Sequence, residues 1–240
     1  MTPRIGLIVP ASNTAAEVQF QRYAPAGVGV HTTRLRMTGK WQKPLREMEG
    51  AIADAAAMLS DTSPGVIVFH CTANSMAEGA AGEARILELI EKASGCAALT
   101  TGQAIKEALG ELRLKKLVLI SPYEKATNEH EIEFLGEAGF TVIHDLGLGL
   151  SGGGDEYLRI TPREWTELTV ENRRAGADGY FLSCTATSMI EAIEPIEERL
   201  HKPVVNSNQA VLWSALRRLK IAEPIAGLGR LLEPVQATAG

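Results

Sequence analysis

Two of the three cysteines stand in the same sequence context. Residues 69–79 read FHCTANSMAEG and residues 182–192 read LSCTATSMIEA, so both contain the pattern C-T-A-x-S-M-x-E after an apolar run. A thiol can attack an electrophilic carbon, or it can donate and accept a proton. A pair of equivalent thiols could act on opposite faces of one small, flat substrate, so Cys71 and Cys184 are the candidate catalytic residues.

Small polar residues follow each cysteine, where an apolar strand is expected to end and a helix to begin. Backbone N–H groups and hydroxyls at such a turn can bind a carboxylate, and the same surroundings lower the pKa of a thiol. The serines of the two turns could instead cap the helices. The candidate substrate-binding residues of the two turns are Thr72, Ala73, Ser75, Thr185 and Ala186.

Three further strand ends carry polar side chains that could reach the same ligand. Asn13, in PASNT, could bind a carboxylate oxygen, or it could form an Asx turn or a helix cap. Tyr123 follows a strand-terminal proline, and its phenol could donate to a carboxylate. Asn206 begins the run Asn206, Ser207, Asn208 at the end of a later strand, and we expect it on the same rim.

Other groups near these turns have structural interpretations. His70 precedes Cys71, but adjacent strand residues point to opposite faces, so a direct pairing requires the turn to begin at once. Cys96 begins a predicted strand, away from the carboxyl edge, and is expected to pack in the core. The glycine-rich stretch 147–157 lacks a phosphate-binding fingerprint and is interpreted as a flexible loop or lid.

The elements that must position these residues are alternating strands and helices. Apolar residues recur at i, i+3, i+4 and i+7 between short β-branched runs, which is typical of a parallel sheet covered on both faces by amphipathic helices. The predicted strands are residues 4–9, 28–35, 65–70, 97–100, 116–121, 140–148, 179–184 and 203–207.

The repeat extends beyond the cysteine turns. GLIVP is matched by VLISP 112 residues later, and LTTGQA is matched by VNSNQA 106 residues later, in the same order along the chain. This self-similarity predicts an α/β fold of two similar lobes related by a pseudo-twofold axis, each a roughly four-stranded, mainly parallel sheet flanked by helices, with the active site in the cleft between them. The approximate lobes are residues 1–110 and 111–240, with the C-terminal helix able to pack on the first lobe.

Composition excludes several classes of partner. The 240 residues have a formal net charge of -5 with the cationic residues spread along the chain, which argues against nucleic acid and acidic membrane surfaces. No apolar run resembles a secretory signal or a membrane span, so a cytoplasmic location is expected. Three cysteines without metal-ligand spacing argue against disulfides and zinc, and we expect no cofactor.

The motifs IVPASNT, VHTTRLRM, CTANS and LSCTATS, with the strand-end Tyr123, give the chain a family resemblance. It resembles the aspartate/glutamate racemase superfamily, and within it most closely the branch of maleate cis-trans isomerases and arylmalonate decarboxylases. In that branch two α/β lobes each supply a cysteine, and the chemistry beside a carboxylate needs no cofactor. The resemblance covers nearly the whole chain.

The resemblance implies a cofactor-independent isomerase of a small carboxylate or dicarboxylate, with maleate to fumarate as the leading reaction. Cys71 matches the cysteine that adds to the double bond, Cys184 matches the proton donor, and Asn13 and Tyr123 match residues that hold carboxylates. Where the isomerases have a carboxylate-binding Asn, this chain has Gly153, which puts the dicarboxylate substrate in doubt.

Three other functions stay open from the sequence. An amino-acid racemase of the Asp/Glu type would use both thiols as acid and base. An arylmalonate-type decarboxylase keeps only the cysteine that matches Cys184, so the presence of Cys71 counts against it. A non-catalytic carboxylate-binding protein would keep the fold without turnover. A homo-oligomer is expected from the frequency of symmetric assemblies alone.

Overall fold

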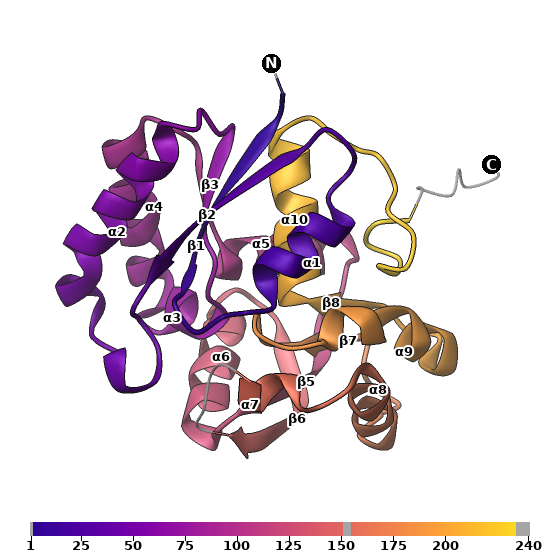
Figure 1. Cartoon of the computed structure of the whole chain (residues 1–240). Helices are drawn as coiled ribbons and strands as arrows, with labels where there is room; N and C mark the ends of the chain where they lie inside the picture. The colour runs from indigo at the N-terminus through magenta and orange to yellow at the C-terminus, as the bar shows by residue number, and fades with distance from the viewer. Residues whose placement is uncertain (1, 151–154, 234–240) are drawn as a thin grey trace.

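The computed structural model describes residues 2–150 and 155–233 of the chain, and its strands lie where the sequence predicts them (Figure 1). The strands are β1 (Arg4–Pro10), β2 (Gly29–Leu35), β3 (Val66–Phe69), β4 (Ala98–Thr100), β5 (Lys116–Tyr123), β6 (Thr141–Leu150), β7 (Gly179–Leu182) and β8 (Val204–Asn206). The helices are α1 (Ala16–Tyr23), α2 (Leu45–Ser60), α3 (Thr72–Met76), α4 (Gly79–Ser94), α5 (Thr101–Glu111), α6 (Lys125–Glu137), α7 (Asp155–Leu158), α8 (Pro162–Glu171), α9 (Ile193–Leu200) and α10 (Ser207–Arg218), with short 3₁₀ helices η1 (Gly39–Trp41) and η2 (Met189–Ala192).

The strands form two four-stranded sheets with the same internal order. The first sheet is β2-β1-β3-β4 and the second is β6-β5-β7-β8, and every neighbouring pair is parallel. Each strand of the first half therefore has a counterpart four strands later, as a duplicated sequence requires. The predicted fold class, two similar α/β lobes with parallel sheets, is confirmed.

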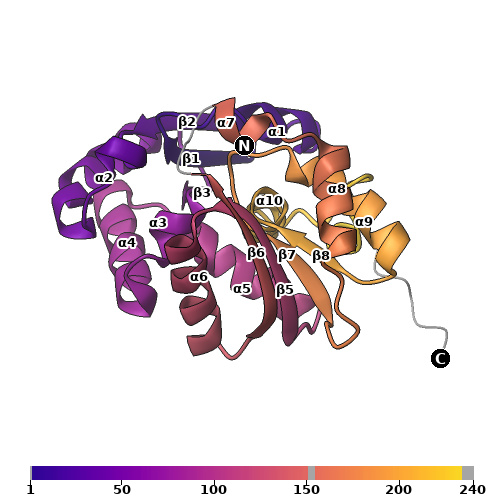
Figure 2. The ribbon, with the colours of Figure 1, turned by 90° about the horizontal axis from the view of Figure 1, so that it is seen from below.

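The helices divide into outer layers and an inner layer. Helices α2 and α4 pack together on the outside of the first sheet, and α8 and α9 pack together against the second (Figures 1 and 2). Helices α5 and α10 pack against each other between the sheets, and α10 also contacts α1 and β3 of the first half. The last helix of the chain thus packs on the first lobe as well as on its own.

The larger hydrophobic core is continuous across both halves. Ile5 and Leu7 of β1 belong to the same buried cluster as Leu117 and Leu119 of β5, through the apolar faces of α5 and α10. A second, smaller cluster lies under α2 and α4. The division near residue 110 stays a prediction, because this shared core joins the two sheets. No helix in the described parts of the chain is long and apolar enough to span a membrane.

Candidate active site

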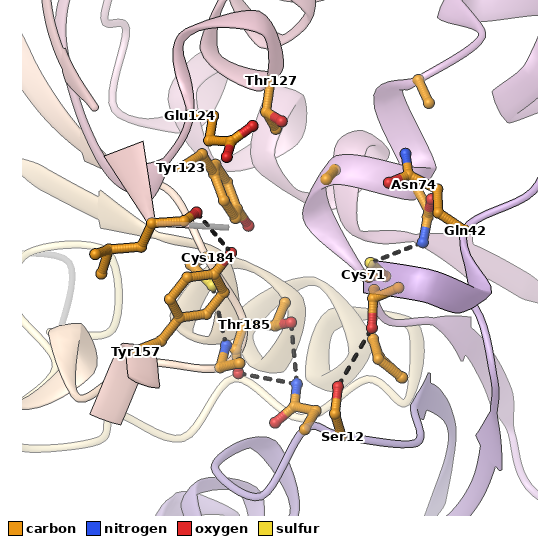
Figure 3. Close-up of a pocket in the computed structure, with 18 of the residues that line it drawn as sticks. Ser12, Gln42, Cys71, Asn74, Tyr123, Glu124, Thr127, Tyr157, Cys184 and Thr185 are labelled. Atoms are coloured by element: carbon orange, nitrogen blue, oxygen red, sulfur yellow. Dashed lines mark hydrogen bonds between the residues drawn. The ribbon is translucent and has the colours of Figure 1, made fainter. Parts of the chain in front are cut away.

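One pocket of about 180 Å³ contains both repeated cysteines (Figure 3). Its lining comes from residues at or just after the carboxyl ends of β1, β2, β3, β5, β6 and β7, and from the helices α3, α6 and α7. Parallel strands whose ends converge at one edge present their following loops to the same cavity. Six strand ends from two sheets thus build one site, in the cleft where the sequence predicted it.

Cys71 lies at the start of α3, directly after the fully buried strand β3. Its backbone is extended, and its side chain is only 5% exposed. Asn74, one turn into α3, donates from Nδ2 to the Cys71 Sγ (3.4 Å) and to the main-chain oxygen of Met37 (2.8 Å) (Figure 3). Burial raises the pKa of the Cys71 thiol to about 11, and the N–H groups of Asn74 offset part of that shift.

Cys184 follows β7 in the second sheet and has different partners. The Ala186 N–H donates to the Cys184 Sγ (3.3 Å), and the Cys184 N–H donates to Oγ of Ser207 (3.2 Å). Burial raises the pKa of this thiol to about 12, while the hydroxyl of Tyr123 and the Ala186 N–H lower it in part. The two thiols are thus held by unlike donors.

The expected lowering of the thiol pKa is wrong, because burial raises the pKa of both thiols. Helix α3 has only five residues, and Cys184 is followed by bends and η2 rather than by an α-helix, so neither sulfur faces the end of a long helix dipole. No lysine or arginine is among the described residues that line the pocket. Without a nearby positive charge, burial favours the neutral thiols.

Asn13 and Thr185 lie together at the floor of the pocket and join the two halves. Nδ2 of Asn13 donates to the main-chain oxygen and to Oγ1 of Thr185, both at 3.1 Å. Oδ1 of Asn13 accepts from the N–H groups of Ala15 and Ala16 at the start of α1. The Asn13 amide is therefore engaged in an Asx turn that precedes α1, whereas the Thr185 hydroxyl keeps its own proton available for a ligand.

Tyr123 ends β5 and points into the pocket beside Tyr157 of α7 (Figure 3). The two rings meet edge to face, with centroids 6.0 Å apart. Burial raises the pKa of Tyr123 well above its ordinary value, so its phenol is a neutral hydrogen-bond donor. Gly147 permits the main chain of β6 to lie close to the end of β5, because a Cβ there would lie 2.6 Å from the main-chain oxygen of Tyr123.

Thr72 and Ser75 do not line the pocket, although Ala73 between them does. Both hydroxyls are buried and already paired: Thr72 donates to Oγ of Ser207, and Ser75 donates to the main-chain oxygen of Thr72 while accepting from the Gly102 N–H. Successive residues of a helix point in different directions, so only part of the turn faces the cavity. The sequence-based expectation that these two hydroxyls contact a ligand is therefore wrong.

Asn206 is also placed away from the pocket, with its neighbours in the run 206–208. Its Oδ1 caps α10 by accepting from the Asn208 N–H, and its Nδ2 donates to the main-chain oxygen of Leu182. The strand end is buried because β8 leads directly into α10, which packs against α5 between the sheets. The expectation that this strand end reaches the ligand rim is therefore corrected.

His70 belongs to the same buried layer and does not hydrogen bond to Cys71. Its Nε2 donates to Oδ1 of Asn208 (2.9 Å), and its Nδ1 lies 3.2 Å from Oγ1 of Thr101. Burial lowers the pKa of His70 to about 4, so the ring is neutral at physiological pH. Activation of the thiol by His70, which strand geometry disfavoured, has no hydrogen bond to support it.

Two other sequence expectations concern Cys96 and the glycine-rich stretch. Cys96 precedes β4 at its amino end and packs, partly buried, against the smaller core cluster. Within 147–157, the described residues continue β6 to Leu150 and form α7 from Asp155; Gly153 lies outside the described residues.

Sequence reasoning missed several residues that line the pocket. Asn74 sits inside the quoted CTANS motif, and its placement one turn after Cys71 was the available signal. Glu131 lies on α6 three residues before the buried Phe134, so helical spacing marks it as an acidic residue on an inward face. Thr38, Gln42 and Tyr157 reach the pocket through loops and a short helix, and their spacing carries no such signal.

The chain is similar to proteins of known activity over almost its whole length. A maleate isomerase of Geobacillus stearothermophilus is 26% identical over 243 residues, which cover 95% of this chain and 96% of that protein. An arylmalonate decarboxylase of Bordetella bronchiseptica is 27% identical over 241 residues, covering 97% of each. A crystal structure of arylmalonate decarboxylase superposes with a TM-score of 0.84 at 27% identity, covering 96% of this chain and 99% of that one.

Fold and site together define a two-lobed α/β enzyme with a pair of cysteines in the cleft between its sheets. The sequence profile of the arylmalonate decarboxylase family matches residues 5–232, and the chain belongs to that family. The expected place in the branch of maleate isomerases and arylmalonate decarboxylases is confirmed.

Proposed function

We propose that the protein is a maleate cis-trans isomerase that uses Cys71 and Cys184 as its reactive pair. The observation that carries the proposal is the presence of both buried thiols in one pocket. The similarity to maleate isomerases over almost the whole chain supports the same reaction. The neutral phenol of Tyr123 and the hydroxyl of Thr185 are donors suited to a substrate carboxylate.

The proposed reaction starts from the minor fraction of the protein in which Cys71 has lost its proton to solvent, because burial keeps most of this thiol neutral. The Cys71 thiolate adds to one carbon of the double bond while the Cys184 thiol protonates the neighbouring carbon. The new C–C single bond then rotates. Cys184, now a thiolate, removes a proton from that carbon; the C–H electron pair forms the trans double bond as the C–S pair returns to Cys71. Cys71 is assigned as nucleophile because Asn74 gives its sulfur a dedicated side-chain N–H donor.

Decarboxylation is the second function the family offers, and the site favours isomerisation over it. A decarboxylase needs one thiol to protonate the carbanion left after loss of carbon dioxide. The structure places a second thiol, Cys71, in the same pocket as Cys184. An amino-acid racemase would also use two thiols, so measurements of turnover with maleate and with amino acids must distinguish isomerisation from racemisation.

Proton NMR of the protein with maleate tests the proposal. We expect fumarate to appear with the wild-type protein, and Cys71→Ser and Cys184→Ser each to lower kcat/KM by at least about a thousandfold, because a hydroxyl is a much weaker nucleophile and acid. Cys96→Ser is the matched control, since Cys96 does not line the pocket, and its activity should equal the wild type. Carbon dioxide release from an arylmalonate, or deuterium incorporation at the α-carbon of aspartate without fumarate formation, would replace this function with one of its alternatives.

The order of the two thiols is testable by intact-protein mass spectrometry. In Cys184→Ser the proton that completes the adduct must come from solvent, and the thiolate that would remove it again is absent. We therefore expect a covalent maleate adduct to form slowly on Cys71 and to accumulate there. An adduct on Cys184 in the reciprocal Cys71→Ser variant, together with no adduct on Cys71 in Cys184→Ser, would reverse the assignment.

A further inference from the structure

Glu131 is a buried carboxyl group that the proposed reaction does not use. Its side chain lines the pocket from α6, the residue is only 1% exposed, and neither carboxyl oxygen has a hydrogen-bond partner within the described structure. The hydroxyl of Ser183, directly before Cys184, is also buried and unpartnered. Ser183 does not line the pocket, whereas Glu131 does. Buried polar groups in folded proteins are nearly always paired, so an unpartnered carboxyl that lines a cavity indicates that a ligand completes it.

The groups around Glu131 include the reactive pair. Burial is the main cause of the raised pKa of Cys71, Cys184 and Tyr123, and the nearby carboxyl of Glu131 adds to it in each case. On the neighbouring strand β6, Asp145 accepts from Asn128, which lies one turn before Glu131 on α6. The other titratable side chains that line the pocket are Glu124, His130 and Tyr157, and none of the described lining residues is a lysine or an arginine.

This environment decides the form in which the carboxyl is present. Burial raises the pKa of Glu131 to about 8, and Ser183, which faces it outside hydrogen-bonding geometry, offsets part of the shift. A neutral carboxyl can donate a hydrogen bond, whereas an ionised one can only accept and would repel an anion. A dianionic ligand beside Glu131 disfavours its ionised form further.

We propose that Glu131, as a neutral carboxylic acid, is a substrate-binding residue that donates a hydrogen bond to one carboxylate of a dicarboxylate substrate. The proposal rests on the proposed function, because it takes the substrate to be a dianion. The pocket then holds two carboxylates without lysine or arginine: Tyr123 and Thr185 supply donors to one, and Glu131 supplies the donor to the other. Binding of the dianion and retention of the Glu131 proton are consequently linked.

Binding of succinate, a saturated dicarboxylate with no double bond to react, is the test. Above the Glu131 pKa, the wild-type protein should take up nearly one proton per succinate at about pH 9, and its affinity should fall roughly tenfold per pH unit. Calorimetry in two buffers of different ionisation enthalpy measures the proton uptake. The amide of Glu131→Gln keeps a donor, so its affinity at pH 7 should stay within about threefold of the wild type and lose its pH dependence.

Two further variants separate the hydrogen bond from other effects. Glu131→Leu removes the donor and should weaken succinate binding roughly ten- to a hundredfold at pH 7, in line with the loss of a hydrogen bond to a charged group. Glu133→Gln removes a carboxyl from the exposed side of the same helix and should bind as the wild type. Because Leu replaces an unpaired buried carboxyl, this variant is expected to fold.

Several outcomes would overturn the assignment. They are wild-type affinity in Glu131→Leu, a loss in Glu131→Gln as large as in Glu131→Leu, release of a proton on binding, or no succinate binding to the wild type. If the Glu131 variants convert maleate as fast as the wild type, this inference is wrong but the proposed reaction stands. If succinate binding is linked to proton uptake but maleate is not converted, only the proposed reaction is wrong.

Discussion

At the scale of single residues, duplication has produced two cysteines with the same neighbours in sequence but different partners in space. Cys71 accepts from the side chain of Asn74, whereas Cys184 accepts from the Ala186 N–H and lies beside the Tyr123 hydroxyl. The position equivalent to Asn74 is Thr187, whose hydroxyl accepts from the main chain instead. The turn at Cys71 thus has a side-chain donor to its sulfur, and the turn at Cys184 does not. This difference suits a nucleophile at Cys71 and a proton donor at Cys184.

The raised thiol pKa values predict the alkylation behaviour of the free protein. At about pH 7.5, iodoacetamide should label the partly exposed Cys96 faster than Cys71 and Cys184, which are buried and almost wholly protonated. Labelling of Cys71 should accelerate roughly tenfold per pH unit up to its pKa of about 11, because only the thiolate reacts. Peptide mass spectrometry at several pH values measures each site. Faster labelling of Cys71 than of Cys96 at neutral pH would mean that the empty pocket already stabilises a thiolate.

At the scale of elements, the start of α10 after β8 connects the two lobes and does not line the pocket. Asn208 of α10 accepts from His70, donates to the main-chain oxygen of Thr185 and pairs with Gln19 of α1, and Gln19 also donates to the main-chain oxygen of Thr187. This polar layer connects α1, α10, the end of β3 and the turn after β7. The order of the pocket therefore depends on contacts that no ligand touches.

Removing the centre of this layer should destabilise the fold. Asn208→Ala leaves the buried His70 Nε2 donor and the Thr185 oxygen with one partner fewer, so we expect the free energy of unfolding to fall by about 2–3 kcal/mol. Urea denaturation followed by circular dichroism measures it. Gln21→Ala, at an exposed position on α1, is the control and should cost less than about 1 kcal/mol. Equal losses in the two variants would show that the layer adds nothing to stability.

At the scale of the whole molecule, two related halves have become one folding unit. The main hydrophobic cluster includes residues of both sheets, and α5 and α10 form an interface between them. Two domains with separate cores would leave a thinner, more polar contact between them. The cleft that holds both thiols is therefore set by a shared core and not by a hinge between independent lobes.

This shared core predicts a single cooperative unfolding transition. Trp41 reports on the first half and Trp165 and Trp213 on the second, so variants that keep only one of these tryptophans provide local fluorescence probes. Their urea midpoints and the circular dichroism midpoint should coincide, because loss of either half exposes the core of the other. Separate midpoints for the two halves would show instead that they unfold as independent domains.

Much of the architecture could be predicted because it depends on local patterns. Predicted runs of four to nine residues marked all eight strands. The central strands are nearly apolar throughout because both of their faces are buried, whereas the edge strands β2 and β6 are partly exposed and carry polar residues. The repeated CTAxSMxE turn marked Cys71 and Cys184 as counterparts, and equal strand orders followed from the duplication. The parallel topology then placed both turns at the carboxyl edges of their sheets.

The sequence by itself therefore determined the two lobes, the paired thiols and the edge at which they meet, because periodicity and repetition are properties of the chain. Only the tertiary structure decided that the polar side chains of Thr72, Ser75 and Asn206 form hydrogen bonds within the protein. It also placed Glu131 in the same pocket as the two thiols. Those outcomes depend on which surfaces pack against each other across more than a hundred residues. Burial likewise raises the thiol pKa values, and it exists only once the two sheets have packed around the pocket.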